Sequence, residues 1–264
     1  MMTLFTGLSA VLLLSMFVWM LSIFKKDASI VDNFWGVFFA VLFAVYMYPM
    51  AAKNLPLPVP TLLMAATLGA WVLRYSVYIY FRNHGRPEDY RYATIRQNWQ
   101  PGFWWKSLFI IFLFQGALTW VLSGPFYMAT QVYDQTYCIA LSYAGCGLSF
   151  FGLLFEAVAD FQLSRFKQAA QENNIKDAVM DKGLWRYSRH PNYFGQSCLW
   201  FGFAFIAIGY TGAWSLLYAP ALMTWLLLKF SGISLMESTI TERRPAYKDY
   251  MARTNAFIPW WPKR

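Results

Sequence analysis

Apolar residues run almost without interruption through seven stretches of this 264-residue chain. Each stretch is close to the roughly 20 residues that an α-helix needs to cross the hydrocarbon core of a membrane. The stretches lie at about residues 3–24, 29–50, 61–81, 104–127, 135–159, 193–211 and 213–236. The pattern predicts an all-α integral membrane protein with seven transmembrane helices, which form a single domain over residues 1–264.

The first stretch has the length of a membrane span, lacks a preceding basic segment and shows no small-residue cleavage site, so we expect a retained helix. Lys and Arg then indicate the orientation, because seven spans place successive loops alternately on two sides. They gather at 25–26, 82–106, 165–189 and 243–264, whereas the opposite loops contain Lys53 alone. By the positive-inside rule, we expect the N-terminus outside and the C-terminus in the cytoplasm.

The composition excludes several classes of protein. Hydrophobic residues make up 58% of the chain and charged residues 13%, about half the charged fraction of a soluble domain, so intrinsic disorder is also excluded. Three cysteines without a CxxC or Cys/His cluster exclude a disulfide scaffold and indicate no metal site. The net charge of +9 would suit nucleic acid, but most of these charges set the topology, so we expect no nucleic-acid partner.

Ionisable residues in or beside a span cost free energy in lipid, so they are the first candidates for a functional site. Asp32 stands near the start of the second span, with Trp35 on the same helical face. Two interpretations fit Asp32. It is either a helix-end carboxylate at the level of the headgroups or a carboxyl facing a pocket, where the loss of water favours the neutral form.

The third span carries a polar stripe. Arg74, Tyr78 and Arg82 follow one another at intervals of four residues and therefore share one helix face. Tyr75 lies beside this stripe, and Arg86 follows the helix. Guanidinium groups bind phosphate oxygens in a bidentate manner, so the face suits a phosphate-bearing ligand. Alternatively the arginines extend to the lipid headgroups, which accounts less well for Arg74, deeper in the span.

The fifth span ends in a second polar stripe. Glu156, Asp160, Ser164 and Lys167 are separated by steps of four, four and three residues. The spacing places all four on one face of a helix that continues out of the apolar run. This face either borders a pocket or forms a ladder of intrahelical ion pairs, each worth a few tenths of a kcal/mol.

The most informative segment precedes the sixth span, at residues 182–200. Pro191 suits the first turn of a helix, and Asn192 and Gln196 then share a face one turn apart. Amide side chains and free backbone N–H groups at a helix N-terminus can hold a nucleotide or a carboxylate. The polar residues of the segment include Arg189, His190, Asn192, Tyr193 and Gln196.

Glu237 ends the last span and precedes a basic tail that includes Arg243. We expect it to pair with an arginine of this tail, a role that is compatible with a binding site. No GxxxxGK[ST], GxGxxG, HExxH or GxSxG motif occurs in the chain. A nucleotide cofactor would therefore be held between helices and cytoplasmic loops.

Three blocks of the chain together resemble the membrane steroid 5α-reductase family, in particular its bacterial members. The blocks are GRPEDYRY at 85–92, GLWRYSRHPNYFGQ at 183–196 and RRPAYKDYMARTNAFIPW at 243–260. The similarity covers mainly the C-terminal two-thirds of the chain. It implies a seven-helix protein of the bacterial inner membrane that binds NADPH on the cytoplasmic side and transfers hydride to C5 of a Δ4-3-oxo-steroid or a similar enone lipid.

The resemblance also assigns residues. Asp160, Asn192, Tyr193 and Arg86 match positions that contact the dinucleotide in the family. The polar stripes, the 182–200 segment and the tail supply the remaining expected cofactor contacts, which are Arg74, Arg82, Glu156, Lys167, Arg189, His190, Gln196, Glu237 and Arg243. The animal members have Asn, Arg and Glu where this chain has Glu156, Lys167 and Gln196.

The animal members polarise the steroid ketone with a glutamate from helix two and a tyrosine from helix three. Asp32 and Tyr75 are the corresponding catalytic candidates, although neither aligns without a shift. A neutral carboxyl and a phenol together can stabilise the developing enolate. Trp35 and Tyr78 are the expected contacts of a substrate that arrives from the bilayer.

Two other functions remain open. The RHPNYFG sequence also resembles the Arg-His-Pro-x-Tyr-x-Gly motif of membrane methyltransferases that act on isoprenylcysteine or phospholipid amines. In those proteins a glutamate near the final helix helps to bind S-adenosylmethionine, as Glu237 could here. The 85–92 block, the FIPW tail and the seven spans favour the reductase. The other alternative is a non-catalytic sterol- or lipid-binding membrane protein, against which the polar stripes argue.

Overall fold

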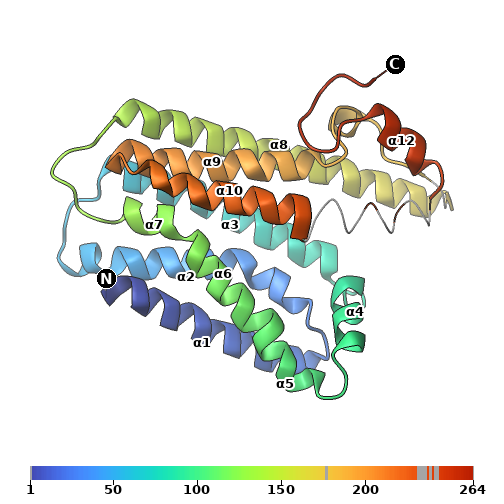
Figure 1. Ribbon diagram of the computed structural model, residues 1–264, viewed down its shortest axis with the longest axis horizontal. Helices are drawn as coiled ribbons and strands as arrows, with labels where there is room; N and C mark the ends of the chain where they lie inside the picture. Colours follow the sequence, from blue (N-terminus) through green and yellow to red (C-terminus); the bar gives the residue numbers. More distant parts are fainter. Residues whose placement is uncertain (1, 176–177, 231–236, 238–239, 241–243, 264) are drawn as a thin grey trace. The chain divides into compact units, whose positions relative to one another are not determined.

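The computed structural model describes residues 2–175, 178–230, 237, 240 and 244–263, and every regular element in these residues is helical (Figure 1). Within this described part of the chain, six helices are long and apolar enough to cross a membrane. This finding confirms the prediction of an all-α chain with membrane-spanning helices. The six are α1 (Met2–Lys25), α2 (Ile30–Ala52), α3 (Val59–Asn83), the continuous helix Phe103–Leu122, α8 (Ile139–Glu172) and α9 (Pro191–Thr211).

The remaining elements are short. The continuous helix Phe103–Leu122 consists of α5 (Phe103–Ser107), the π-helix η1 (Leu108–Leu113) and α6 (Phe114–Leu122). The predicted seventh span, 213–236, begins as η3 (Trp214–Leu217), α10 (Tyr218–Trp225) and η4 (Leu226–Phe230). Its last residues, 231–236, lie outside the described part of the chain. The other short elements are α4 (Tyr90–Asn98), α7 (Gly124–Ala129), η2 (Gly183–Arg186) and α12 (Tyr247–Arg253).

The chain forms two compact units. Unit 1 comprises Met1–Ser142 and Ile206–Leu216, and unit 2 comprises Tyr143–Phe205 and Leu217–Arg264. Helices α8 and α9 contribute residues to both units, because the division falls within each of them. The expectation of a single domain stays a prediction.

Aromatic side chains fill the core of unit 1. The ring of Phe39 in α2 meets Trp71 of α3 and Phe126 of α7, each in an edge-to-face arrangement at a centroid distance of 5.8 Å. All three side chains are fully buried. Such pairs add about 0.5–1.5 kcal/mol each beyond the area that they bury. The cluster therefore fixes α2 and α3 as neighbours near the turn of α2 that carries the candidate Asp32.

Small residues let α8 and α9 run side by side in unit 2 (Figure 1). A Cβ atom added to Gly195 would lie 2.6 Å from the backbone nitrogen of Glu156, and one added to Gly202 would collide with Ser149. The two glycines are seven residues apart, which keeps them on one helix face. Membrane helices commonly approach through such small-residue seams. Here the seam brings the first turn of α9 against the Glu156–Asp160 stretch of α8.

Helix α8 is longer than a membrane is thick. Its 34 residues correspond to a length of about 51 Å, whereas the hydrocarbon core of a bilayer measures about 30 Å. The polar C-terminal part of α8, from Asp160 onward, therefore suits the headgroup region and the water beyond it. Three of the four residues of the stripe predicted at the end of the fifth span, Asp160, Ser164 and Lys167, lie in this part, and Glu156 lies one turn before it.

Candidate functional site

Asp32 lies at the centre of a polar cluster in unit 1. Its Oδ2 atom accepts a hydrogen bond from Arg91 Nη2 at 3.0 Å, and its Oδ1 atom accepts one from the Tyr92 hydroxyl at 2.6 Å. Both donors belong to the first turn of α4, where the Asp89 side chain caps the helix by accepting from the Arg91 backbone N–H. The GRPEDYRY block thus folds back onto the start of α2.

Further contacts hold the two donors in place. The guanidinium of Arg91 also donates to both carboxylate oxygens of Asp89 at 3.0 Å. Gln115 Nε2 in α6 donates to the Tyr92 hydroxyl at 3.2 Å. The cluster is therefore a connected chain that runs from an amide through a phenol and a carboxylate to a guanidinium, and it draws on α2, α4 and α6.

Electrostatics keep the phenol protonated. Burial and the negative charge of Asp32 raise the pKa of Tyr92 well above its ordinary value. Burial alone would also raise the pKa of Asp89, but the hydrogen bond and charge of Arg91 outweigh it and hold that pKa below its ordinary value. At neutral pH, Tyr92 is consequently a hydrogen-bond donor beside a carboxylate that is paired with an arginine.

The predicted catalytic phenol, Tyr75, occupies a different position. Its ring lies 5.4 Å from that of Trp71 on α3, and a Cβ atom added to Gly36 would lie 3.3 Å from it. Gly36 follows Asp32 by one turn of α2. Tyr75, which belongs to α3, therefore packs against α2 one turn from Asp32. The phenol that donates a hydrogen bond to Asp32 is that of Tyr92, a residue for which the sequence indicated no role. Tyr92 is buried in α4, a helix whose other residues are mostly polar. An aromatic residue within this polar stretch was the sequence signal that could have identified it.

The stripe on α3 is a stack of cations on an aromatic ring. The Arg74 and Arg82 guanidinium carbons lie 5.1 and 6.0 Å from the centroid of the Tyr78 ring. Asn83 links α3 to α2 by donating to Asn33 at 3.2 Å. The shared face predicted for these residues is present, and its phosphate ligand stays a prediction. Arg86 is exposed in the turn after α3.

Substrate contacts were expected at Trp35 and Tyr78. The Trp35 ring packs edge-to-face on Phe39 at 5.5 Å, within α2. Tyr78 takes part in the stack on α3. Both residues belong to unit 1, as Asp32 does, and their role in substrate binding stays a prediction.

In unit 2, the stripe on α8 meets the start of α9. Asn192 Nδ2 donates to Asp160 Oδ1 at 3.1 Å. Glu156 and Asp160 are buried, whereas Lys167 is exposed. This hydrogen bond joins α8 to α9, and whether the stripe borders a pocket stays a prediction. Gln196 is half-buried one turn further along α9.

The Arg-His pair before α9 binds one carboxylate. Arg189 donates to both oxygens of Glu237, at 2.7 Å from Nε and 3.0 Å from Nη2, and His190 Nε2 lies 3.1 Å from Oε1. The His190 ring stacks on that of Tyr193. Glu237 thus pairs with an arginine of the 182–200 segment, and its expected pairing with an arginine of the tail stays a prediction. The predicted residue Arg243 lies outside the described residues.

Burial and charge act in opposite directions on Glu237. Burial raises the pKa of its carboxyl group, but the hydrogen bond from His190 and the positive charge of Arg189 outweigh it and hold the pKa below the ordinary value of 4.5. The same negative charge adds to burial in raising the pKa of Tyr247 to about 12. Glu237 is therefore an ionised group that is already engaged by two donors.

Backbone hydrogen bonds fasten the C-terminal tail to the same segment. Arg189 Nη1 donates to the carbonyls of Met251 and Thr254, and the Arg189 backbone N–H donates to Asn255. The Ser188 hydroxyl donates to the Phe257 carbonyl at 2.7 Å. The tail and the segment before α9 therefore fold as one clamp. Sequence patterns gave no indication of these contacts, since backbone carbonyls carry no residue signature.

The structure thus divides the predicted site residues between the two units. Those of unit 1 are Asp32, Trp35, Arg74, Tyr75, Tyr78, Arg82 and Arg86. Those of unit 2 are Glu156, Asp160, Lys167, Arg189, His190, Asn192, Tyr193, Gln196 and Glu237. Within unit 1 the structure joins Asp32 to α4, and within unit 2 it joins Asp160 to Asn192 and Glu237 to Arg189 and His190.

Comparison with known proteins gives the family of the chain. An uncharacterized protein of the fission yeast Schizosaccharomyces pombe, C594.04c, is 26% identical to it over 96% of this chain and 78% of the yeast protein. No solved structure shows a significant match. The family DUF1295, described as proteins of unknown function, matches residues 18–254. The chain therefore belongs to the DUF1295 family.

Proposed function

We propose that this protein is an NADPH-dependent reductase that saturates the C4–C5 double bond of a Δ4-3-oxo-steroid or a similar enone lipid. The DUF1295 family includes steroid 5-alpha-reductase-like members, and the three sequence blocks resemble that family. The observation that carries the proposal is the buried phenol of Tyr92, held between Asp32 and Gln115. We further propose seven spans in the bacterial inner membrane, with the N-terminus outside and the cofactor on the cytoplasmic side.

The chemistry asks the protein for a donor at one oxygen atom. Hydride reaches C5 from the nicotinamide, which is the chemistry that NADPH supplies when bound. Negative charge then develops on the ketone oxygen, and protonation at C4 completes the saturated ketone. A preorganised donor aimed at that oxygen lowers the barrier, because it stabilises charge that appears only in the transition state.

In this proposal the Tyr92 phenol is that donor. Its proton lies on the hydrogen bond to Asp32, and rotation about the phenolic C–O bond turns it toward a ketone oxygen. Arg91 keeps the Asp32 carboxylate paired while the phenol turns. Asp32 therefore acts as a positioning residue, through its hydrogen bonds to Tyr92 and Arg91. Tyr75 of α3, which packs near Gly36 one turn of α2 from Asp32, stays the alternative phenol.

The donor set of unit 2 suits a dinucleotide. A carboxylate such as Asp160 accepts hydrogen bonds from ribose hydroxyls, and the Asn192 amide beside it offers both a donor and an acceptor. Lys167, two turns further along the same face of α8, provides a cation for a phosphate. The phosphate-binding role that the sequence suggests for Arg74, Arg82 and Arg86 of unit 1 stays a prediction. Arg189 and Glu237 are engaged with each other and with the tail, so we assign them to holding the clamp.

Ligand-dependent stability tests the proposal. The purified protein is titrated with NADPH, NADH and S-adenosylmethionine while its thermal unfolding is followed. A ligand that binds only the native state stabilises it by about 2.7 kcal/mol at a hundred times its dissociation constant. We expect NADPH to raise the melting temperature at lower concentration than NADH. Stabilisation by S-adenosylmethionine alone would contradict the proposal.

One observation favours a second function. Glu237 adjoins the Arg-His pair of the RHPNYFG motif, as a methyltransferase of the isoprenylcysteine or phospholipid type would require. Three donor atoms of Arg189 and His190 already engage its two oxygens, so it has little capacity left for S-adenosylmethionine. This saturation places the methyltransferase second. A protein that only binds sterols or lipids would respond to none of the three nucleotides.

A further inference from the structure

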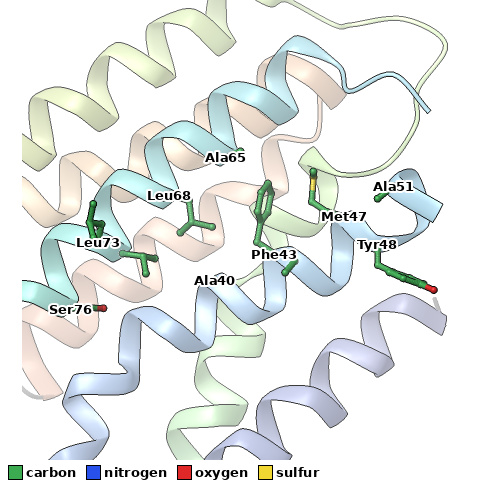
Figure 2. A pocket seen from close by; sticks show the side chains of 12 residues that line it. Ala40, Phe43, Met47, Tyr48, Ala51, Ala65, Leu68, Leu73 and Ser76 are labelled. Carbon is green, nitrogen blue, oxygen red and sulfur yellow. The ribbon is translucent and has the colours of Figure 1, made fainter. Parts of the chain in front are cut away.

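An apolar groove of about 710 Å³ opens between α2 and α3 in unit 1 (Figure 2). This volume lies within the range of about 300–1,000 Å³ that is typical of small-molecule sites. Ala40 and Ala44 of α2 and Ala65 and Gly69 of α3 lack bulky side chains and leave the space open. Phe43 of α2 also lines the groove, between the two helices in the view of Figure 2.

The groove lies within two candidate membrane spans. Its lining extends over residues 40–51 of α2 and 65–76 of α3, which are the C-terminal half of α2 and the middle of α3, two helices long enough to cross a bilayer. Lipid tails are as apolar as the side chains that line it, so no hydrophobic force drives the two helices to close the groove. In this setting the material available to fill it is hydrocarbon.

Each end of the groove has a residue with a hydroxyl group, Ser76 at one end and Tyr48 at the other (Figure 2). Among the described residues, the Ser76 hydroxyl oxygen is buried and has no hydrogen-bond partner. A buried hydroxyl that makes no hydrogen bond costs free energy, so such groups in proteins are normally satisfied. A hydroxyl or carbonyl oxygen of a ligand lying in the groove would supply the missing partner.

The same end adjoins the candidate site. A Cβ atom added to Gly36 would lie 3.5 Å from Ser76 Oγ and 3.3 Å from the Tyr75 ring. Gly36 follows Asp32 by one turn of α2. The Ser76 end of the groove is therefore the end nearer to Asp32, and the groove extends away from it along both helices.

We infer that this groove binds the apolar body of an elongated membrane lipid whose polar end hydrogen-bonds Ser76. The lining extends about 16 Å along α2, from residue 40 to residue 51, so the groove covers that length of the body. One part of the inference rests on the proposed function, namely that the enone substrate is such a lipid and reaches Asp32 along the groove. The binding site itself does not depend on it.

Photolabelling in a bilayer tests the inference. The protein is placed in phosphatidylcholine nanodiscs with a hexadecanol that carries a diazirine in mid-chain, and labelled peptides are identified by mass spectrometry. We expect labelling of the α2 and α3 peptides that saturates and is displaced by unlabelled hexadecanol. Labelling that rises linearly and resists competition would reflect surrounding lipid alone and would overturn the inference.

Two substitutions sharpen the test. Ala44→Trp fills the groove and should abolish saturable labelling, whereas Ala144→Trp, which adds the same bulk at an exposed position of α8, should leave it unchanged. Ser76→Ala should raise the half-saturating concentration about fivefold, the effect of one lost hydrogen bond. Equal labelling of Ala44→Trp and the wild type would overturn the inference.

Two further readouts separate the possible failures. NADPH titration of the same variants reports on the proposed function, so retained stabilisation by NADPH without saturable labelling would refute the groove alone. Small-residue faces can also pair with the helix of a second copy. If hexadecanol does not label the groove and Ala44→Trp converts a dimer to a monomer in mass measurements, a second copy is the occupant and the inference is wrong.

Discussion

Units 1 and 2 each contain a carboxylate that binds an arginine and one further donor, but the two clusters are built differently. Asp32 accepts a single hydrogen bond from Arg91 and one from a phenol. Glu237 accepts two from Arg189 and adjoins an imidazole. The side chains of Glu237 and Arg189 are each 11% exposed, whereas those of Asp32 and Arg91 are 16% and 28% exposed.

The difference indicates which cluster holds structure and which can take part in chemistry. Arg189 Nη1 donates to two carbonyls of the tail. Removing any side chain of the Glu237 cluster would therefore leave buried polar groups without partners. The Tyr92 hydroxyl can rotate away from Asp32 without breaking the ion pair behind it. We therefore assign the fastening of the tail to the Glu237 cluster and the proton-donating role to the Asp32 cluster.

The largest effect should come from breaking the cluster in unit 2. Arg189→Ala leaves Glu237 buried beside an empty space and releases two carbonyls, so we expect a loss of about 3–5 kcal/mol in the free energy of unfolding. Arg186→Ala, an exposed residue of the same segment, is the control and should change little. Thermal unfolding in detergent measures both, and equal melting temperatures would refute the assigned structural role.

The second effect concerns catalysis in unit 1. Tyr92→Phe removes the proposed donor and should lower kcat about 100- to 1,000-fold, as the loss of one oxyanion donor does in other enzymes. Its melting temperature should fall less than that of Arg189→Ala, because Asp32 keeps its ion pair with Arg91. Tyr75→Phe is the matched control, and steady-state reduction of a Δ4-3-oxo-steroid is the measurement. If Tyr75→Phe abolishes activity and Tyr92→Phe does not, the phenol is Tyr75.

The third effect concerns cofactor affinity. Asp160→Ala removes a charged acceptor and frees Asn192, so NADPH should bind about tenfold or more weakly, in line with the 1.5–3 kcal/mol of a hydrogen bond to a charged group. Protein yield should be unchanged. Ser164→Ala, on the exposed part of the same stripe, should bind NADPH normally. Equal affinity for all three proteins would make the stripe on α8 structural.

The fourth effect is a pH dependence of the clamp. Because the folded pKa of Glu237 lies below its ordinary value of 4.5, the carboxylate stabilises the fold fully above that value. This contribution is lost as the pH falls through the folded pKa. Melting temperatures of the wild type and Glu237→Gln should therefore converge as the pH falls below about 4.5. A constant difference from neutral pH to acid would refute the linkage.

The smallest effect should come from a surface ion pair of unit 2. Arg253 in α12 pairs with Asp181, and the two side chains are 51% and 34% exposed. Exposed pairs contribute about 0–1 kcal/mol, so Arg253→Ala should change the melting temperature little. Comparison of Arg253→Ala with Arg189→Ala separates the effect of burial on stability from the effect of removing a charge. A loss as large as that of Arg189→Ala would show that exposure does not distinguish the two pairs.

The sequence predicted the long apolar helices well, because an apolar run of about 20 residues is typical of a helix that crosses a membrane. The expected ranges 3–24 and 29–50, for example, correspond to Met2–Lys25 and Ile30–Ala52. The face shared by Glu156 and Asp160 was also predictable, since helix periodicity follows directly from spacing. These features are local, and local patterns can be read from neighbouring residues.

The partners of the candidate residues were not predictable in the same way. Tyr92 lies 60 residues from Asp32, and Arg189 lies 48 residues from Glu237. Which helix faces which depends on packing, for instance on the close approach at Gly195, which no periodicity in the chain reveals. Sequence reasoning therefore identified Asp32 as a candidate but not Tyr92 and Gln115. These two residues join its cluster only because the chain folds back onto α2.

Isotope transfer tests the central claim most directly. The purified protein is incubated with a Δ4-3-oxo-steroid and NADPH deuterated at the transferable position of the nicotinamide, and the steroid is analysed by mass spectrometry. The account predicts a saturated ketone that carries one deuterium at C5, formed by the wild type and nearly absent with Tyr92→Phe. Unchanged steroid with the wild type, together with methyl transfer from S-adenosylmethionine to a lipid, would contradict it.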